Sequence, residues 1–216
     1  GARTAALAHF DLRVAPGERV ALVGRSGAGK TTAVAPALLA EPWCDGQIIL
    51  TSPRRVAARS AAQFMARQLG EDIGATVGYR IRFDNRVSAR TRIEVVTEGI
   101  LTRMLQDDPL LDGVGALLFD EFHERHLSAD LGLALSLDVQ SQLREDLRIV
   151  VMSATLDGER LARFLDAPRL SSEGRSHAVE IAHLSARRDE PMEVQARRAI
   201  EHVLARHPGD VLVFLP

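Results

Sequence analysis

The sequence has one lysine, one cysteine and few aromatic residues. Of its 27 basic residues 26 are arginine, and the single lysine is Lys30. Cys44 has no second cysteine with which to form an internal disulfide, which is typical of a reducing compartment. No apolar run approaches the length of about 18 residues that a membrane-spanning helix needs, and the N-terminus lacks a signal-peptide pattern. We therefore expect a soluble cytoplasmic protein that does not cross a membrane.

The composition is that of a folded chain, but its charges are unevenly placed. With 216 residues, 46% of them hydrophobic, the chain can bury one large domain and has room for part of another. The net charge is only -2, yet residues 54–92 hold nine arginines against three acids. Residues 107–146 hold ten acids against two arginines. This separation predicts one anion-binding face and one ordinary solvated face.

A glycine-rich loop, GRSGAGKTT, occupies residues 24–32. It matches G-x-x-x-x-G-K-[ST] without a mismatch, follows the apolar residues 20–23 and leads into a helix-prone segment, which is the context of a phosphate-binding loop. The glycines allow backbone N–H groups to point at phosphate oxygens, Lys30 would reach the β- and γ-phosphates, and the Thr31 hydroxyl would bind Mg²⁺. The predicted nucleotide-binding residues are Gly24, Gly27, Ala28, Gly29, Lys30, Thr31 and Thr32. A glycine-rich turn without a ligand is the alternative, and the retention of lysine only at Lys30 argues against it.

Strand-like and helix-like segments alternate along the chain. The expected strands are residues 20–23, 47–51, 76–83, 92–96, 114–119 and 147–152, and the expected helices are residues 31–39, 53–69, 97–105, 127–143 and 157–165. Pro36 predicts a kink or an early end in the first helix. The alternation predicts an α/β fold with an open parallel sheet. Ligands of such sheets bind at the carboxyl ends of strands, where Gly24, Asp120 and Ser153 fall.

Six further motifs resemble those of the DEAH/RHA-type superfamily 2 helicases, most closely the bacterial HrpB-type ATP-dependent helicases. SPRRVAARS at 52–60 resembles motif Ia, TEGILTRML at 97–105 motif Ib, DEFHER at 120–125 motif II and SATLDGERL at 153–161 motif III. SEGRSHAVEI at 172–181 resembles the segment that crosses into the second RecA-like domain, and VLVFLP at 211–216 that domain's first strand. The resemblance implies a P-loop NTPase (RecA-like) fold with helices on both faces of the sheet.

The resemblance also implies a domain organisation. Residues 1–170 would form the first RecA-like, ATP-binding domain, and residues 171–188 a linker or crossing segment. Residues 189–216, with a helix at 192–206 and a strand at 210–215, would begin a second RecA-like domain.

Catalytic roles follow from the same resemblance. Asp120 would hold Mg²⁺, Glu121 would orient or deprotonate the attacking water, and His123 would couple hydrolysis to the neighbouring domain, with Lys30 completing the catalytic set. His123 and His126 lie among acids and suggest a zinc site as an alternative, but no further cysteine or histidine is suitably placed.

Motif III implies a coupling role. Ser153 and Thr155 would link the state of the bound ATP to the grip on nucleic acid. The alternative is that they only cap the following helix.

The implied nucleic-acid contacts are Arg54, Arg55 and Thr97, which match positions that bind the sugar–phosphate backbone. Arg80 and Arg82 belong to a turn that resembles the RNA-gripping hook of the family. Such contacts give salt-dependent, sequence-tolerant binding to single-stranded or structured RNA, with DNA not excluded. Either arginine of the turn could equally lie on the solvent-exposed face of a strand. We expect the protein to act as a monomer.

Two departures from the helicase pattern leave alternatives open. Residues 10–32 resemble the start of an ABC-type ATPase, although residues 90–113 contain no LSGGQ-like signature. Phe64 stands where the wider family has an arginine that stacks on the base, so it either stacks in place of that arginine or belongs to the core.

A third hypothesis is a nucleotide- and RNA-binding module without useful turnover. By resemblance, the arginines that stabilise the transferring phosphoryl group belong to motif VI of the second domain, which is not among these 216 residues. Such an arginine is worth about 10³ to 10⁵ in rate, so we expect this chain alone to bind ATP weakly and to hydrolyse it poorly.

Overall fold

The computed structural model describes residues 14–24, 29–154, 158–172, 179–185 and 190–214. The chain divides into two compact units, residues 1–175 and residues 176–216. None of the described helices is both long and apolar enough to cross a membrane.

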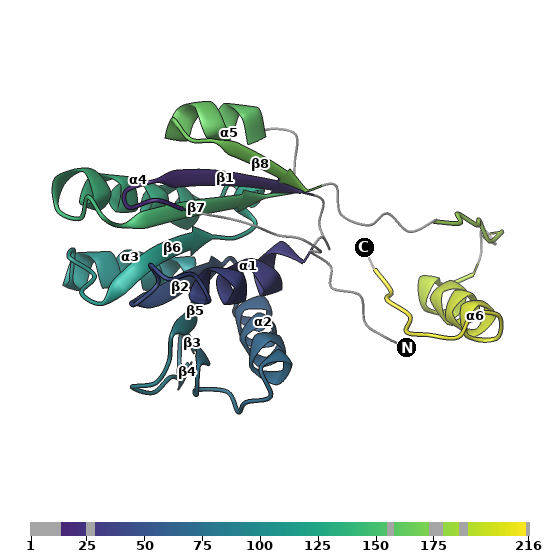
Figure 1. Ribbon diagram of the computed structural model, residues 1–216. Helices are drawn as coiled ribbons and strands as arrows, with labels where there is room; N and C mark the ends of the chain where they lie inside the picture. The colour runs from purple at the N-terminus through teal and green to yellow at the C-terminus, as the bar shows by residue number, and fades with distance from the viewer. Residues whose placement is uncertain (1–13, 25–28, 155–157, 173–178, 186–189, 215–216) are drawn as a thin grey trace. The chain divides into compact units, whose positions relative to one another are not determined.

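The first unit is built on one sheet (Figure 1), which has eight strands among the described residues. The strands are β1 (Arg19–Gly24), β2 (Gln47–Ser52), β3 (Val77–Ile81), β4 (Asp84–Arg86), β5 (Ile93–Thr97), β6 (Val114–Phe119), β7 (Arg148–Ser153) and β8 (Arg169–Ser172). Their spatial order is β4-β3-β5-β2-β6-β7-β1-β8. All neighbours pair in parallel except β3 and β4, which form an antiparallel hairpin at one edge. The predicted open α/β sheet is confirmed, with the short edge strands β4 and β8 added to it.

Helices cover both faces of this sheet (Figure 1) because each central strand is apolar on both sides. The helices are α1 (Lys30–Leu39), α2 (Arg55–Gln68), α3 (Glu98–Asp107), α4 (Leu127–Gln142) and α5 (Gly158–Leu165). Within β2, Ile48 and Leu50 pack in the cluster that contains α1 and α2 residues, whereas Ile49 packs in the cluster that contains α3 and α4 residues. Side chains alternate between the faces of a strand, so one strand serves both cores.

The parallel pairing brings the carboxyl ends of seven strands to one edge of the sheet. Across the order β3-β5-β2-β6-β7-β1, the residues at or just after these ends are Arg82, Thr97, Arg54, Asp120, Ser153 and the phosphate loop. Residues up to 130 positions apart in the sequence therefore share one edge, which is where ligands of open α/β sheets bind.

Helix α1 runs to Leu39 as expected and continues through Pro36, so the early end considered for this helix is wrong. In the second unit, α6 (Met192–Leu204) forms as expected, but residues 210–214 have no regular secondary structure. A strand needs a neighbour to pair its N–H and C=O groups, and the described part of this unit provides no strand beside it.

Gly78 in β3 provides a test of the edge hairpin. A Cβ atom at Gly78 would lie 2.4 Å from the backbone oxygen of Arg86 and 2.9 Å from Cγ1 of Val87. Gly78→Ala should therefore lower the free energy of unfolding by about 1–3 kcal/mol, as overpacked sites do. Chemical denaturation measures this change.

The matched control is Gly99→Ala in α3, where an added Cβ would meet no atom within 4 Å. This substitution should be neutral or should stabilise by up to about 1 kcal/mol, since alanine is the better helix former. Equal destabilisation by both variants would contradict the account of the hairpin.

Candidate nucleotide and nucleic-acid site

The described part of the phosphate loop ends in the geometry that such a loop requires. Gly29 has φ 80° and is the N-terminal capping residue of α1, a left-handed conformation that favours glycine. Lys30 follows and is buried, and its Nζ donates a hydrogen bond to the backbone oxygen of Gly24 at the end of β1. Burial lowers the pKa of Lys30, and the charges of Glu121 and Asp120 oppose this effect. Gly27 and Ala28 lie outside the described residues.

Thr31 and Asp120 meet across 89 positions of sequence. The Thr31 hydroxyl donates a 2.6 Å hydrogen bond to Oδ2 of Asp120, which follows β6. The other carboxylate oxygen, Oδ1, is buried and accepts no hydrogen bond from any described residue. Burial raises the pKa of Asp120 to about 6, while the Thr31 hydrogen bond lowers it. A hydroxyl and a buried carboxylate oxygen with unused accepting capacity are ligands that suit a hard divalent cation.

Glu121 and His123 extend this site toward β7. Glu121 has φ 49°, a strained conformation for a residue with a side chain, and is followed by the short 3₁₀ helix η1 (Phe122–Glu124). Nε2 of His123 lies 3.4 Å from Oε2 of Glu121, and its Nδ1 accepts a 3.2 Å hydrogen bond from the backbone N–H of Ala154. His123 thus joins the acidic pair to the chain leaving β7. Buried Ser153 ends β7, and Thr155 lies outside the described residues.

Phe64 is not a core residue. Its side chain is 44% exposed and lines a hollow of about 320 Å³ together with Glu121 and residues 29–32, Thr32 among them. An aromatic ring beside a phosphate-binding loop can cover the flat face of a nucleotide base.

The residues predicted to bind nucleic acid lie beside the phosphate site. Arg54 precedes α2, is 72% exposed and forms a 3.2 Å ion pair with Glu124. It shares a hollow of about 280 Å³ with Thr31 and Asp120. Arg55 is exposed at the start of α2, and Thr97 precedes α3 without using its side chain as a helix cap.

The two arginines of the edge hairpin differ. The guanidinium of Arg82 is exposed and lies 4.7 Å from the ring centroid of Phe83, itself 87% exposed. Arg80 forms a 2.7 Å ion pair with the buried carboxylate of Glu94. Arg80 therefore already balances a protein charge, and Arg82 is better placed to meet a phosphate.

The basic run at residues 54–92 is partly structural for the same reason. Arg59 pairs with Asp84 at 2.6 Å, and Arg92 donates to the backbone oxygens of Gly46 and Cys44. Counting charges along the sequence overestimates the cations available to a ligand, because it does not show which are already paired.

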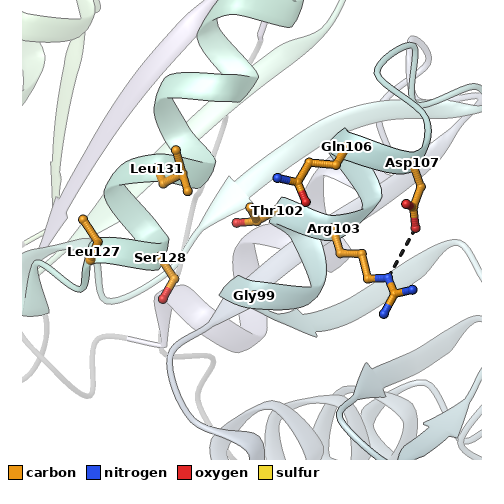
Figure 2. A pocket seen from close by; sticks show the side chains of 8 residues that line it. All are labelled: Gly99, Thr102, Arg103, Gln106, Asp107, Leu127, Ser128 and Leu131. Carbon is orange, nitrogen blue, oxygen red and sulfur yellow. Dashed lines mark hydrogen bonds and ion pairs between the residues drawn. The ribbon is translucent and has the colours of Figure 1, made fainter.

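A separate hollow of about 520 Å³ lies between α3 and α4 (Figure 2). Gly99, Thr102 and Arg103 of α3 line it opposite Leu127 and Ser128 of α4. None of its lining residues is a predicted site residue, although Gly99, Thr102 and Arg103 belong to motif Ib.

A family model described as DEAD/DEAH box helicase matches residues 6–164. The chain belongs to the DEAD/DEAH box helicase family. The match includes residues 10–32, so the segment that resembles an ABC-type ATPase is part of the helicase match, and that alternative is set aside.

Individual relatives agree with this assignment. The chain is 51% identical over 199 residues to the ATP-dependent RNA helicase HrpB of Escherichia coli, covering 92% of this chain and 25% of that protein. It is 38% identical over 200 residues to the probable ATP-dependent RNA helicase DHR2 of Saccharomyces cerevisiae, covering 90% and 27%. A crystal structure of the Escherichia coli DEAH/RHA helicase HrpB matches with a TM-score of 0.82, 51% identity and the same shares of 92% and 25%. The chain thus spans about a quarter of these relatives.

The zinc alternative gains no support. Among the residues that the structure describes, no group of three histidine, cysteine or acidic side chains is arranged to hold a metal ion. His123 and His126 instead form separate contacts with carboxylates of this DEAD/DEAH box site.

The buried Asp120 carboxylate should make the ligand-free protein less stable. Its folded-state pKa of about 6 lies above that of an unfolded chain, so the ionised form carries a cost that is present above about pH 6 and disappears as the pH falls toward about 4. Asp120→Asn should therefore raise the free energy of unfolding at pH 7.5 by on the order of 1–3 kcal/mol, with no gain near pH 4.

Denaturation of the metal-free protein at the two pH values measures this difference, with the exposed Asp138→Asn as control. An Asp120→Asn variant that is less stable than the parent at pH 7.5 would contradict the interpretation of this site.

Proposed function

We propose that the full-length protein is an ATP-dependent RNA helicase and that this chain supplies its first RecA-like, ATP-binding domain. The observation that carries the proposal is the convergence of Lys30, Thr31, Asp120 and Glu121 at one edge of the sheet, beside Arg54. The ATP-hydrolysis site and the nucleic-acid-binding site need to be adjacent if hydrolysis is to change the binding of nucleic acid. The relatives HrpB and DHR2 are named as an ATP-dependent RNA helicase and a probable one, which favours RNA over DNA as the partner.

Thr31 and Asp120 would hold Mg²⁺ in this proposal. The buried Oδ1 of Asp120 and the Thr31 hydroxyl fit such an ion. When bound, Mg²⁺ would neutralise part of the negative charge of the phosphates. Lys30 would exchange its contact with the Gly24 carbonyl for phosphate oxygens, which is favourable because a buried ammonium gains an anionic partner.

Glu121 would orient the attacking water and accept its proton. Its 3.4 Å contact with Nε2 of His123 and its place in the hollow lined by residues 29–32 support this role. His123 would report the state of this site to Ser153 and Thr155 of motif III through the Ala154 N–H. A positioned general base contributes about 10² to 10⁴ in rate.

RNA would run along the neighbouring strand ends. Arg54, Arg55 and Thr97 follow or end the adjacent strands β2 and β5, and Arg82 follows β3 on their far side. These groups would contact the sugar–phosphate backbone, which gives salt-dependent binding of any sequence. Arg80 would contribute less because Glu94 already holds it.

Glu121→Gln is the direct test of the hydrolytic role. In the full-length protein it should reduce the RNA-stimulated turnover of ATP by about 10² to 10⁴-fold while leaving nucleotide binding intact, because the amide cannot accept the proton. Steady-state ATPase and a fluorescent nucleotide titration measure the two quantities.

The exposed Glu145→Gln serves as the matched control for this substitution. RNA binding without ATP turnover in the unmodified full-length protein would instead support the binding-module hypothesis.

The 216-residue chain alone should hydrolyse ATP about 10³ to 10⁵ times more slowly than the full-length protein.

Phe64 would stack on the nucleotide base. Phe64→Ala should raise the KM for ATP about 5- to 10-fold with little change in kcat, since stacking of this kind is worth roughly 1 kcal/mol in ground state and transition state alike. Phe64→Tyr should retain the parental KM. The control is Leu69→Ala, which removes a side chain of the same 44% exposure beside the end of α2. An unchanged KM in Phe64→Ala would assign the ring no part in nucleotide binding.

A further inference from the structure

His126 lies between two carboxylates that the motif analysis did not single out. Its Nδ1 is 3.4 Å from Oε1 of Glu98, and its Nε2 is 3.4 Å from Oε2 of Glu124. Carboxylates accept hydrogen bonds, so a protonated ring nitrogen of His126 can donate to the carboxylate beside it, and the geometry places one carboxylate beside each nitrogen.

These contacts continue to the proposed RNA face. The same Glu124 carboxylate forms the 3.2 Å ion pair with Arg54, so the order of contacts is Arg54, Glu124, His126 and Glu98. Arg54 follows β2, Glu98 follows β5, and the other two follow β6. Because β5, β2 and β6 are neighbours in the sheet, this row of side chains joins three adjacent strand ends.

The row contains more negative charge than Arg54 alone can balance. Glu98 is buried, and its burial raises its pKa, whereas the neighbouring His126 lowers it. Arg54 points into solvent with 72% of its side chain exposed. Without His126, two carboxylates would stand beside Arg54 and Thr97 and would repel an approaching phosphate.

We propose that His126 is a positioning residue for RNA. Its ring offsets the negative charges of Glu98 and Glu124, so that Arg54 and Thr97 can contact the phosphate backbone. This inference rests on the proposed RNA contacts of Arg54 and Thr97. It assigns His126 no part in ATP hydrolysis, since its contacts lead away from Asp120 and Glu121.

Variants of His126 should fold. The residue caps α4 through its backbone oxygen, which accepts from the N–H groups of Ala129 and Asp130, and its side chain makes no capping bond. Substitution therefore leaves the helix start intact. Arginine at this position carries a positive charge and can donate to both carboxylates, whereas alanine can do neither.

The test measures RNA-stimulated ATPase of the full-length protein against single-stranded RNA at low salt. His126→Ala should raise the RNA concentration for half-maximal stimulation roughly 3- to 10-fold, as expected for the loss of one partly exposed charge beside a phosphate contact. The turnover without RNA and the turnover at saturating RNA should stay at the parental values. His126→Arg should keep the parental RNA concentration, and adding Glu98→Gln to His126→Ala should restore most of the loss.

The matched control is the exposed His207→Ala in the second unit. A His126→Ala profile that equals this control overturns the inference. So does a loss that neither His126→Arg nor the added Glu98→Gln repairs, because that result indicates a structural role. If Arg54→Ala and Thr97→Ala also leave RNA stimulation unchanged, the proposed RNA face itself is wrong, whereas a loss in these two variants alone rejects only the role of His126.

Discussion

The parallel hydrogen-bond ladder of the sheet is the constraint on which the site depends. Parallel strands point their carboxyl ends the same way, so the ladder brings together residues that no local interaction could assemble. The Thr31 hydroxyl and Oδ2 of Asp120 lie 2.6 Å apart because β1, β7 and β6 run side by side. The register of those strands must persist for the phosphate loop to face the acidic pair, and the two apolar cores that clamp the sheet maintain it.

At this edge of the sheet, charged side chains are held in electrostatically unfavourable environments. Lys30 and Asp120 are both buried, and desolvation works against the charged form of each. Glu121 adds a left-handed backbone. Such groups fit a ligand that brings charge of both signs, as a nucleotide with its cation does, because each buried charge then gains a ligand charge of opposite sign. The apolar packing beneath the edge provides the stability that these groups remove.

Much of the fold could be predicted from local pattern. The continuous apolar run at β6 and the phosphate-loop pattern before α1 each depend on neighbouring residues alone, and both expectations were correct. The short polar strand β4 has no apolar alternation that would reveal it, since its three residues pair with β3 only after the chain has turned. Residues 210–214 show the converse case, because an apolar run needs a paired neighbour to become a strand.

The site residues also differ in whether local sequence pattern is enough to predict them. Lys30, Thr31 and Asp120 belong to motifs whose spacing carries their chemistry, so the sequence predicted them as site residues, and the structure brings Thr31 and Asp120 into contact. The pairing of Arg80 with Glu94, and of His126 with Glu98 and Glu124, follows from strand order and side-chain direction, neither of which is visible in the sequence. Charge counts predicted a basic face but could not distinguish a paired arginine from an exposed one.

The central claim is that one edge of the sheet binds nucleotide and RNA in mutual dependence. The most direct measurement is the equilibrium affinity of the full-length protein for single-stranded RNA with and without a non-hydrolysable ATP analogue and Mg²⁺, together with the reciprocal titration of nucleotide. The account predicts that each ligand changes the affinity for the other by the same factor, on the order of 5- to 100-fold. Two affinities that are each unaffected by the other ligand would contradict it.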